Sequence, residues 1–357
     1  MHAGRRYSFQ EIIRWTRRDI YVMIILSAIP TLLVALLGWH WLALPWVPIA
    51  MIGTATAFIV GFRNTQTYNR LWEARQIYGG IVNASRSWGM LVKDLVGTNQ
   101  NRAAVPAASA WAADSEGMGN ATAFDSAWST HQQLIHRHIA WLTAMRFQLR
   151  EPRTWETSRS KISNQEYGRR FQVAEWQGSL EAELQPLLSP ADLAYILSKK
   201  NRATHLISLQ SAQLRDLKAA GLIEPLNYVE LEKLLVDLYD LQGRCERIKN
   251  FPYPRQFATI SQLFTRLFIS LVPFGVLNEF QKTGGWMILA TIPFASVVGW
   301  IFLTMERIGE NTENPFEGGA NDVPITAMSR TIEIDLREML GEKELPPGVG
   351  AQNNILL

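Results

Sequence analysis

Four apolar blocks stand out from the otherwise polar pattern of the chain and form two pairs. Residues 20–39 and 45–62 carry no charged side chain, and only a short segment separates them. Residues 260–280 and 286–305 form the second pair, joined by a turn that contains Gly284 and Gly285. A helix of about 20 residues, rising about 1.5 Å per residue, crosses a hydrocarbon core of about 30 Å. The pattern predicts four membrane-spanning helices in two antiparallel hairpins, rather than buried helices of a soluble domain.

The segment between the two hairpins, residues 63–257, is polar and charged and is expected to form a helical body. An apolar stripe at helical spacing supports this expectation, and it consists of Leu231, Leu234, Leu235, Leu238 and Leu241. Residues 101–130 are rich in Ala, Ser, Gly and Asn, which predicts a loop or a weakly ordered insertion. Residues 306–357 are expected to form a tail. The predicted fold class is therefore all-α: an integral membrane protein with four transmembrane helices, whose residues 1–357 form one subunit.

Basic residues determine the predicted orientation. They cluster on the polar side of all four spans, whereas the two short hairpin turns hold only Lys282 among Lys and Arg. Because cytoplasmic segments carry an excess of Lys and Arg, both termini and the body are expected in the cytoplasm of a bacterial inner membrane. The basic residues that support this orientation are Arg5, Arg6, Arg14, Arg17, Arg18, Arg63, Arg70, Arg75, Arg86, Lys249, Arg255 and Arg307.

Composition excludes several classes of function. The formal net charge is only +3, and no basic block with interleaved aromatic residues indicates nucleic-acid binding. The single cysteine, Cys245, has no partner for an internal disulfide and no companions for a Cys-based zinc site. No catalytic Ser/His/Asp set, phosphate-binding loop or dinucleotide motif is present. The sequence thus predicts neither an enzyme nor a protein that needs a cofactor.

Three groups of polar residues are candidates for binding chemistry. His131, His136 and His138 lie within about two helical turns and form a possible metal site, although the absence of a nearby Cys or carboxylate pattern favours solvated or capping roles. Arg266 lies within the third span, where it either faces the ion path or a structural partner, or snorkels to the membrane surface. Acidic residues follow the fourth span, but glycines dilute them and favour ordinary helix-end and loop acids over a calcium site; they are Glu306, Glu310, Glu313, Glu317 and Asp322.

Three passages resemble the bestrophins, particularly the bacterial members. GFRNTQTYNRLWEARQIYGGIVNASRSWG (61–89) is similar to the segment that ends the second membrane helix of that family. GRCERIKNFPYPRQFAT (243–259) is similar to the entry into the third, and ENPFEGGANDVPITAMSRTIEIDL (313–336) to the tail after the fourth. Together with the four spans, the resemblance covers nearly the whole chain.

The resemblance implies a homopentamer around one axial pore. The second membrane helix of the family lines a narrow hydrophobic neck, and the matching positions are Thr54, Phe58 and Phe62. Their spacing agrees with one helical face, although Thr54 departs from the usual apolar residue. A second constriction, the cytoplasmic aperture, falls on Leu226. The dense acidic calcium site of animal members is missing, so we expect no calcium requirement.

Three functions remain open from the sequence. The favoured one is a pentameric channel for chloride and other small monovalent anions. A second is a channel of the same type that selects cations such as sodium, since bacterial relatives include such members. A third belongs to another class, a membrane-anchored helical scaffold that binds a partner and conducts nothing. Side chains of the neck distinguish the first two, and a flux measurement distinguishes the third.

Overall fold

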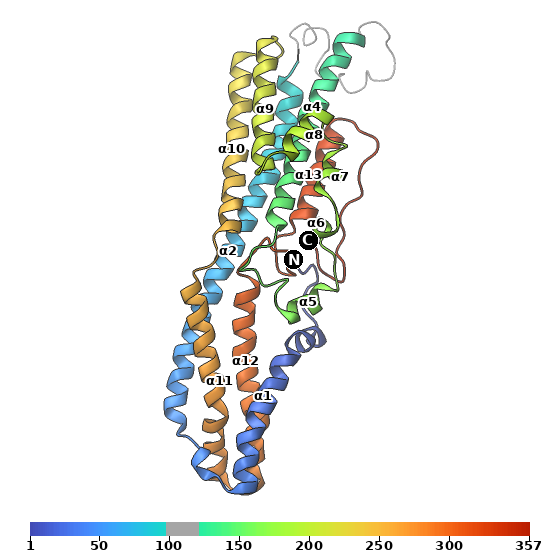
Figure 1. Cartoon of the computed structure of the whole chain (residues 1–357). Coiled ribbons are helices and arrows are strands. Elements are labelled where there is room, and N and C mark those ends of the chain that lie inside the picture. The colour runs from blue at the N-terminus through green and yellow to red at the C-terminus, as the bar shows by residue number, and fades with distance from the viewer. Residues whose placement is uncertain (98–120) are drawn as a thin grey trace.

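Helices form almost all of the regular structure of the chain (Figure 1). The computed structural model describes the backbone of residues 1–97 and 121–357, and side chains of residues 1–97 and 130–357. Within these ranges the structure contains helices, two isolated β-bridges near the termini and no β-strand. The all-α prediction is confirmed.

The structure describes only residues 121–130 of the predicted loop at residues 101–130. Residues 101–120 lie outside the described residues. Residues 121–130 are helical, because helix α4 spans Ala121–Arg150. For these ten residues the loop prediction is wrong, since a high alanine content favours a helix more than it favours a loop.

Four helical segments at one end of the molecule are long and apolar enough to cross a membrane, as the sequence predicts. Less than half of the most apolar stretch of each is buried inside the chain. The remaining apolar surface is therefore available to lipid or to another copy. The segments consist of α1 (Phe9–Leu37), η1 (His40–Leu42), α2 (Trp46–Leu95), α11 (Arg255–Thr283), η2 (Gly285–Ala290) and α12 (Thr291–Asn311).

Glycines allow these helices to turn and to approach closely. Gly284 and Gly285 have φ values of 76° and 60°, so the predicted tight turn between α11 and α12 forms where a side chain would be strained. A Cβ atom at Gly53 of α2 would lie 2.5 Å from the ring of Phe268 on α11. The small residue thus sets the distance between these two helices.

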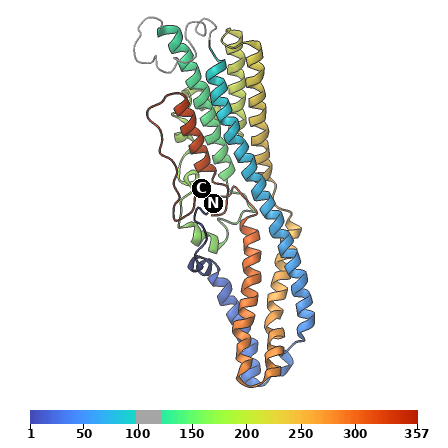
Figure 2. The same cartoon turned by 180° about the vertical axis from the view of Figure 1, so that it is seen from behind.

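Helix α2 joins the membrane end of the molecule to its other end. It runs for 50 residues without a break, about 75 Å, well past residue 62, where the second span was expected to end. Its far half packs among the helices of the body, as both views show (Figures 1 and 2). These helices are α4, α9 (Arg202–Ala219), α10 (Pro225–Asn250) and α13 (Ile325–Met339).

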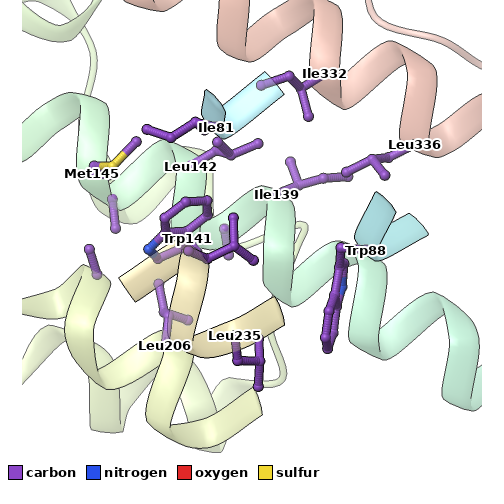
Figure 3. Packing of buried hydrophobic residues seen from close by; sticks show 14 of the residues in the cluster. Ile81, Trp88, Ile139, Trp141, Leu142, Met145, Leu206, Leu235, Ile332 and Leu336 are labelled. Atoms are coloured by element: carbon purple, nitrogen blue, oxygen red, sulfur yellow. The ribbon is translucent and has the colours of Figure 1, made fainter. Parts of the chain in front are cut away.

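The core of the body centres on Trp141 of α4, which lies among apolar side chains from several helices (Figure 3). Its indole Nε1 donates a hydrogen bond to Oε1 of Gln242 at 2.8 Å, so its one polar atom is satisfied. Labelled neighbours in the core include Ile81 of α2, Leu206 of α9 and Leu235 of α10. Three short helices lie on one side of the body: α6 (Ala174–Gln177), α7 (Leu180–Leu184) and α8 (Pro190–Leu197). A fourth, α5 (Ile162–Gly168), lies at the junction and contacts α1.

The two chain termini meet beside the middle of the molecule (Figures 1 and 2). The backbone N–H of Leu356 donates to the carbonyl oxygen of Met1 at 2.8 Å. At the start of α1, Ser8 and Glu11 form a reciprocal capping box, which fixes where this helix begins. The N-terminal segment, the C-terminal segment and the end of α12 therefore come together at the junction between membrane helices and body.

Candidate functional site

One face of α2 carries the three residues expected to line a neck. Thr54, Phe58 and Phe62 are all exposed, with 78% of Phe58 and 49% of Phe62 accessible. The opposite face buries Gly53 and Val60 against the rest of the chain. Two large aromatic side chains, one helical turn apart, are thus largely uncovered within one chain. This is unusual, because phenylalanine is normally buried.

Residues of this face make two contacts within the chain, but these contacts leave the face exposed. The hydroxyl of Thr54 donates to the carbonyl oxygen of Ala50 at 3.0 Å, one turn earlier in the same helix. The ring of Phe62 lies 6.4 Å from the ring of Phe257 at the start of α11, centroid to centroid. Beyond Phe62 the exposed stripe continues along α2 through Thr65, Asn69, Trp72 and Gln76.

Leu226 lies far from these residues. It is the second residue of α10, directly after Pro225, and 81% of it is exposed. Helix α10 starts at the end of the molecule opposite to the membrane helices (Figure 1). The structure therefore places Leu226 and the α2 face at two separate levels of the molecule and does not bring them into one site.

Arg266 is exposed on α11. Among the described residues, no carboxylate forms an ion pair with its side chain. Its neighbours Leu263 and Leu267 are exposed as well. The guanidinium thus lies on a surface that faces outward from the single chain, so a contact for it has to come from outside that chain.

An ion-pair cluster at the junction escaped the sequence analysis. Arg63, only 2% exposed, lies between Glu306 at 3.0 Å and Glu313 at 3.2 Å. Arg255, which begins α11, reaches the same Glu313 carboxylate at 3.0 Å. Burial raises the pKa of Glu313, and the two arginines oppose that rise. The cluster ties α2, α11 and the segment after α12 together next to Phe62. Each of the three passages that resemble bestrophins contributes one residue to this cluster. Their shared resemblance was the feature of the sequence that could have pointed to it.

Glu306 and Glu310 lie at the end of α12, as expected for helix-end acids. For Glu317 and Asp322 in the following segment, the expectation of ordinary loop acids is wrong. Glu317 is 3% and Asp322 1% exposed. The Glu317 carboxylate accepts a hydrogen bond from the backbone N–H of Thr157 at 2.9 Å. Asp322 accepts from the backbone N–H groups of Gly318 at 2.7 Å and Gly319 at 3.0 Å. Glycines in this segment thus fold it around the acids instead of diluting them.

Burial also changes how these two acids ionise. Burial and, as a smaller cause, the neighbouring Asp322 carboxylate together raise the pKa of Glu317 to about 8. Burial likewise raises the pKa of Asp322, against the opposing charge of Arg150, whose guanidinium lies 3.4 Å away. Neutral Glu317 is therefore the favoured form near pH 7.

The three histidines do not share a site. His131 Nε2 donates to the carbonyl oxygen of Val96, which ends α2, at 2.7 Å, so this ring has a capping role as expected. His136 Nε2 lies 2.6 Å from Glu342. His138 is buried beside Ser85, and burial lowers its pKa to about 3, so the expectation of a solvated ring is wrong for His138. Within the described ranges, no group of three or more His, Cys, Asp or Glu side chains is placed to hold a metal ion.

Comparison with known proteins decides the family. The family described as bacterial/fungal bestrophin protein matches residues 9–338. The chain belongs to this family. Because the match extends over nearly the whole chain, the resemblance inferred from the three passages is confirmed.

Several curated bestrophin relatives have names that describe a channel. The voltage-dependent anion channel-forming protein YneE of Escherichia coli (strain K12) is 24% identical over 300 residues, which cover 84% of this chain and 78% of YneE. The voltage-dependent anion channel-forming protein RSc3414 of Ralstonia nicotianae is 25% identical over 324 residues, which cover 89% of this chain and 86% of that protein. Family membership and these relatives confirm that the chain is no enzyme.

Solved structures agree on the bestrophin fold. The structure of a bacterial bestrophin homolog from Klebsiella pneumoniae superposes with a TM-score of 0.67 at 23% identity, covering 93% of this chain and all of that one. Another structure, described only as that of a membrane protein, gives a TM-score of 0.69 at 22% identity and covers 92% of this chain and 98% of that one. At these identities the likeness establishes the fold, with a helical body and four helices that are long and apolar enough to span a membrane.

Proposed function

We propose that five copies of this bestrophin chain form one channel that passes chloride and other small monovalent anions. The observation that carries the proposal is the exposed face of α2 with Thr54, Phe58 and Phe62. A single chain leaves this face open on one side, so several copies around an axis are needed to enclose it. The anion-channel names of the relatives support the same interpretation, and the family resemblance sets the number at five.

In this proposal Phe58 and Phe62 form two stacked rings, separated by about 6 Å of helical rise. The edge of a phenyl ring carries partial positive charge, so rings whose edges point to the axis favour an anion over a cation. An apolar constriction can close by dewetting, so these rings also act as the gate. Thr54 forms a wider polar ring on the outer side, and Leu226 forms a separate constriction at the far end of the body.

The proposal also assigns a place to the remaining parts of the chain. Residues 1–357 act as one subunit, with residues 63–257 and both termini in the cytoplasm and the spans in the bacterial inner membrane, as the distribution of Arg and Lys indicates. Arg266 faces the ion path or a neighbouring copy. No cofactor is required. Calcium is not required either, because backbone N–H groups already donate to the buried Glu317 and Asp322.

A reversal-potential measurement tests the proposal. Purified protein is reconstituted in a planar bilayer between solutions of unequal sodium chloride concentration, with a chelator present to remove calcium. We expect a current that reverses close to the chloride equilibrium potential. Reversal close to the sodium potential would instead favour the cation-selective alternative. If the reconstituted protein is present in the bilayer but carries no current, the non-conducting scaffold is favoured.

A further inference from the structure

A large cavity lies at the junction between membrane helices and body. Its volume is about 840 Å³, and its walls come from the N-terminal segment, the first turns of α1, α5, the end of α12 and the segment after it. Most of its lining is apolar and aromatic, including Ile12, Trp15, Leu71, Phe171 and Ile308. Pockets of this size, largely apolar with a few polar groups, are typical of sites for small ligands.

The cavity also holds cationic groups that lack a counter-charge. Arg75, Arg159 and Arg169 line it, and among the described residues none of them forms an ion pair. The Nε atom of Arg75 and the hydroxyl of Tyr167 are both buried without a hydrogen-bond partner. Buried donors without an acceptor are rare, because a buried polar group that forms no hydrogen bond costs free energy. Both residues line the same cavity, so each of the two donors could be satisfied by an acceptor bound there.

The carboxylates of the cavity do not supply that acceptor. Glu11 is joined to Arg170 at 3.1 Å and takes part in the capping box of α1. Glu317 already accepts hydrogen bonds from Thr157, and its raised pKa leaves it mostly uncharged near pH 7. The polar side of the cavity therefore has an excess of positive charge.

We propose that this cavity binds a long-chain fatty acid. Its carboxylate accepts hydrogen bonds from Arg75 and Tyr167, and its acyl chain lies along the apolar walls formed by α1, α2 and the end of α12. Access favours a lipid over a soluble metabolite, since Trp15 and Ile308 lie within about two turns of the predicted spans that begin at residue 20 and end at residue 305. This site is independent of the proposed pore, because its residues lie outside the exposed face of α2.

Photolabelling of the full chain tests the site. The protein is placed in nanodiscs of phosphatidylcholine and exposed to a photoreactive oleate, and labelled peptides are identified by mass spectrometry. We expect labelling of peptides that contain Ile12 or Ile308. The methyl ester of the same probe has the same chain but no charge, so we expect it to label these peptides roughly tenfold less, as for the loss of a charged hydrogen bond.

Three variants separate the head contact from a general loss of structure. Arg75→Gln is expected to reduce labelling by oleate about tenfold, whereas Arg75→Lys retains most of it because the positive charge remains. Tyr167→Phe removes one hydroxyl only and is expected to reduce labelling a few-fold. Arg215→Gln is the matched control: it makes the same change of charge at an exposed site on α9, where Arg215 pairs with its neighbour Asp216, and leaves labelling unchanged.

Two outcomes would overturn the proposal. Equal labelling by oleate and its methyl ester would mean that the cavity is only an apolar surface. Full labelling of a folded Tyr167→Phe protein together with full labelling of Arg75→Gln would mean that neither donor holds the carboxylate. Because Tyr167→Phe keeps the aromatic ring, it remains informative even if Arg75→Gln fails to fold.

Discussion

At the scale of single residues, Glu317 shows how burial changes chemistry. Its carboxylate is enclosed by the segment after α12 and by residues 156–158, and the charged groups near it include Asp322, Glu156 and Lys249. Burial is the largest cause that disfavours its ionised form, and the two acidic neighbours act in the same direction. In the unfolded chain the same group would have a pKa near 4.5. The folded state therefore holds a proton that the unfolded state releases over a range of pH.

This difference predicts a loss of stability as pH rises. Between about pH 4.5 and about pH 8 the folded state binds more protons at Glu317 than the unfolded state, so the free energy of unfolding falls by up to about 1.4 kcal/mol per pH unit. Glu317→Gln keeps the shape of the side chain but does not titrate. We expect its melting temperature in detergent to fall less than that of the parent between pH 5 and pH 8.

The control for this experiment is Glu338→Gln, which makes the same chemical change at an exposed position on α13. It should follow the parent across the whole pH range. If the melting temperatures of Glu317→Gln and of the parent fall by the same amount between pH 5 and pH 8, Glu317 does not titrate in this interval and the burial argument fails.

Phe58 is the residue on which the proposed selectivity depends. Phe58→Ala removes a large exposed side chain, so we expect a wider neck, a higher single-channel conductance and a weaker preference for chloride over sodium. The measurement is the current and its reversal potential in unequal salt. Because the side chain packs little within its own chain, folding should be unaffected. Unchanged conductance and selectivity would show that Phe58 does not line the neck.

At the scale of elements, α2 has two faces with different tasks. The face with Gly53 and Val60 packs inside the chain, and the face with Thr54 and Phe58 does not. Gly53 is needed because a Cβ there would meet several atoms of the Phe268 ring. That ring is buried and lies 4.5 Å from the ring of Phe302, so it has little room to move.

Gly53→Ala is therefore expected to lower stability. Overpacking a close helix contact costs about 1–3 kcal/mol, which exceeds the gain of up to about 1 kcal/mol that alanine brings to a helix. Gly61→Ala, on the same helix, is the matched control, since a Cβ there meets nothing within 4 Å of the chain. Thermal melts of both variants in detergent check this. An equal melting temperature for the two would contradict the assigned contact between α2 and α11.

At the scale of the whole molecule, the apolar surface of one chain is incomplete. Phe58, Phe62, Leu226 and Val236 are exposed on α2 and α10, two helices that pack side by side along the molecule. Large apolar side chains that the chain itself leaves uncovered point to contacts with lipid or with another protein copy. Since α10 lies outside the predicted spans, lipid cannot cover its exposed residues, and other copies of the chain are the favoured partners.

The proposed assembly has a defined mass. Native mass spectrometry or light scattering in detergent should give a particle with five times the 40.5 kDa of one chain, after subtraction of bound detergent. We expect this mass to persist on dilution, because the exposed apolar residues that would form the contacts lie on both α2 and α10. A stable monomer or dimer would contradict both the pentamer and the enclosed neck that depends on it.

The sequence by itself determined what local patterns control. Runs of about 20 apolar residues predicted the four spans, and Gly284 and Gly285 predicted the turn, because helix length and turn geometry depend on neighbouring residues. The spacing of Thr54, Phe58 and Phe62 also placed them on one face, since the helical repeat is fixed.

Only the tertiary structure decided which distant residues meet. Arg63 and Glu313 are 250 positions apart, and no local pattern predicts that they share a buried ion pair. The same holds for Glu317, whose pKa depends on Asp322 and on a segment 160 residues away. The three nearby histidines have three separate partners: His131 contacts the C-cap of α2, His138 contacts α2 itself, and His136 contacts Glu342 after α13. Burial and pairing result from the packing of the whole chain, and ionisation follows from burial.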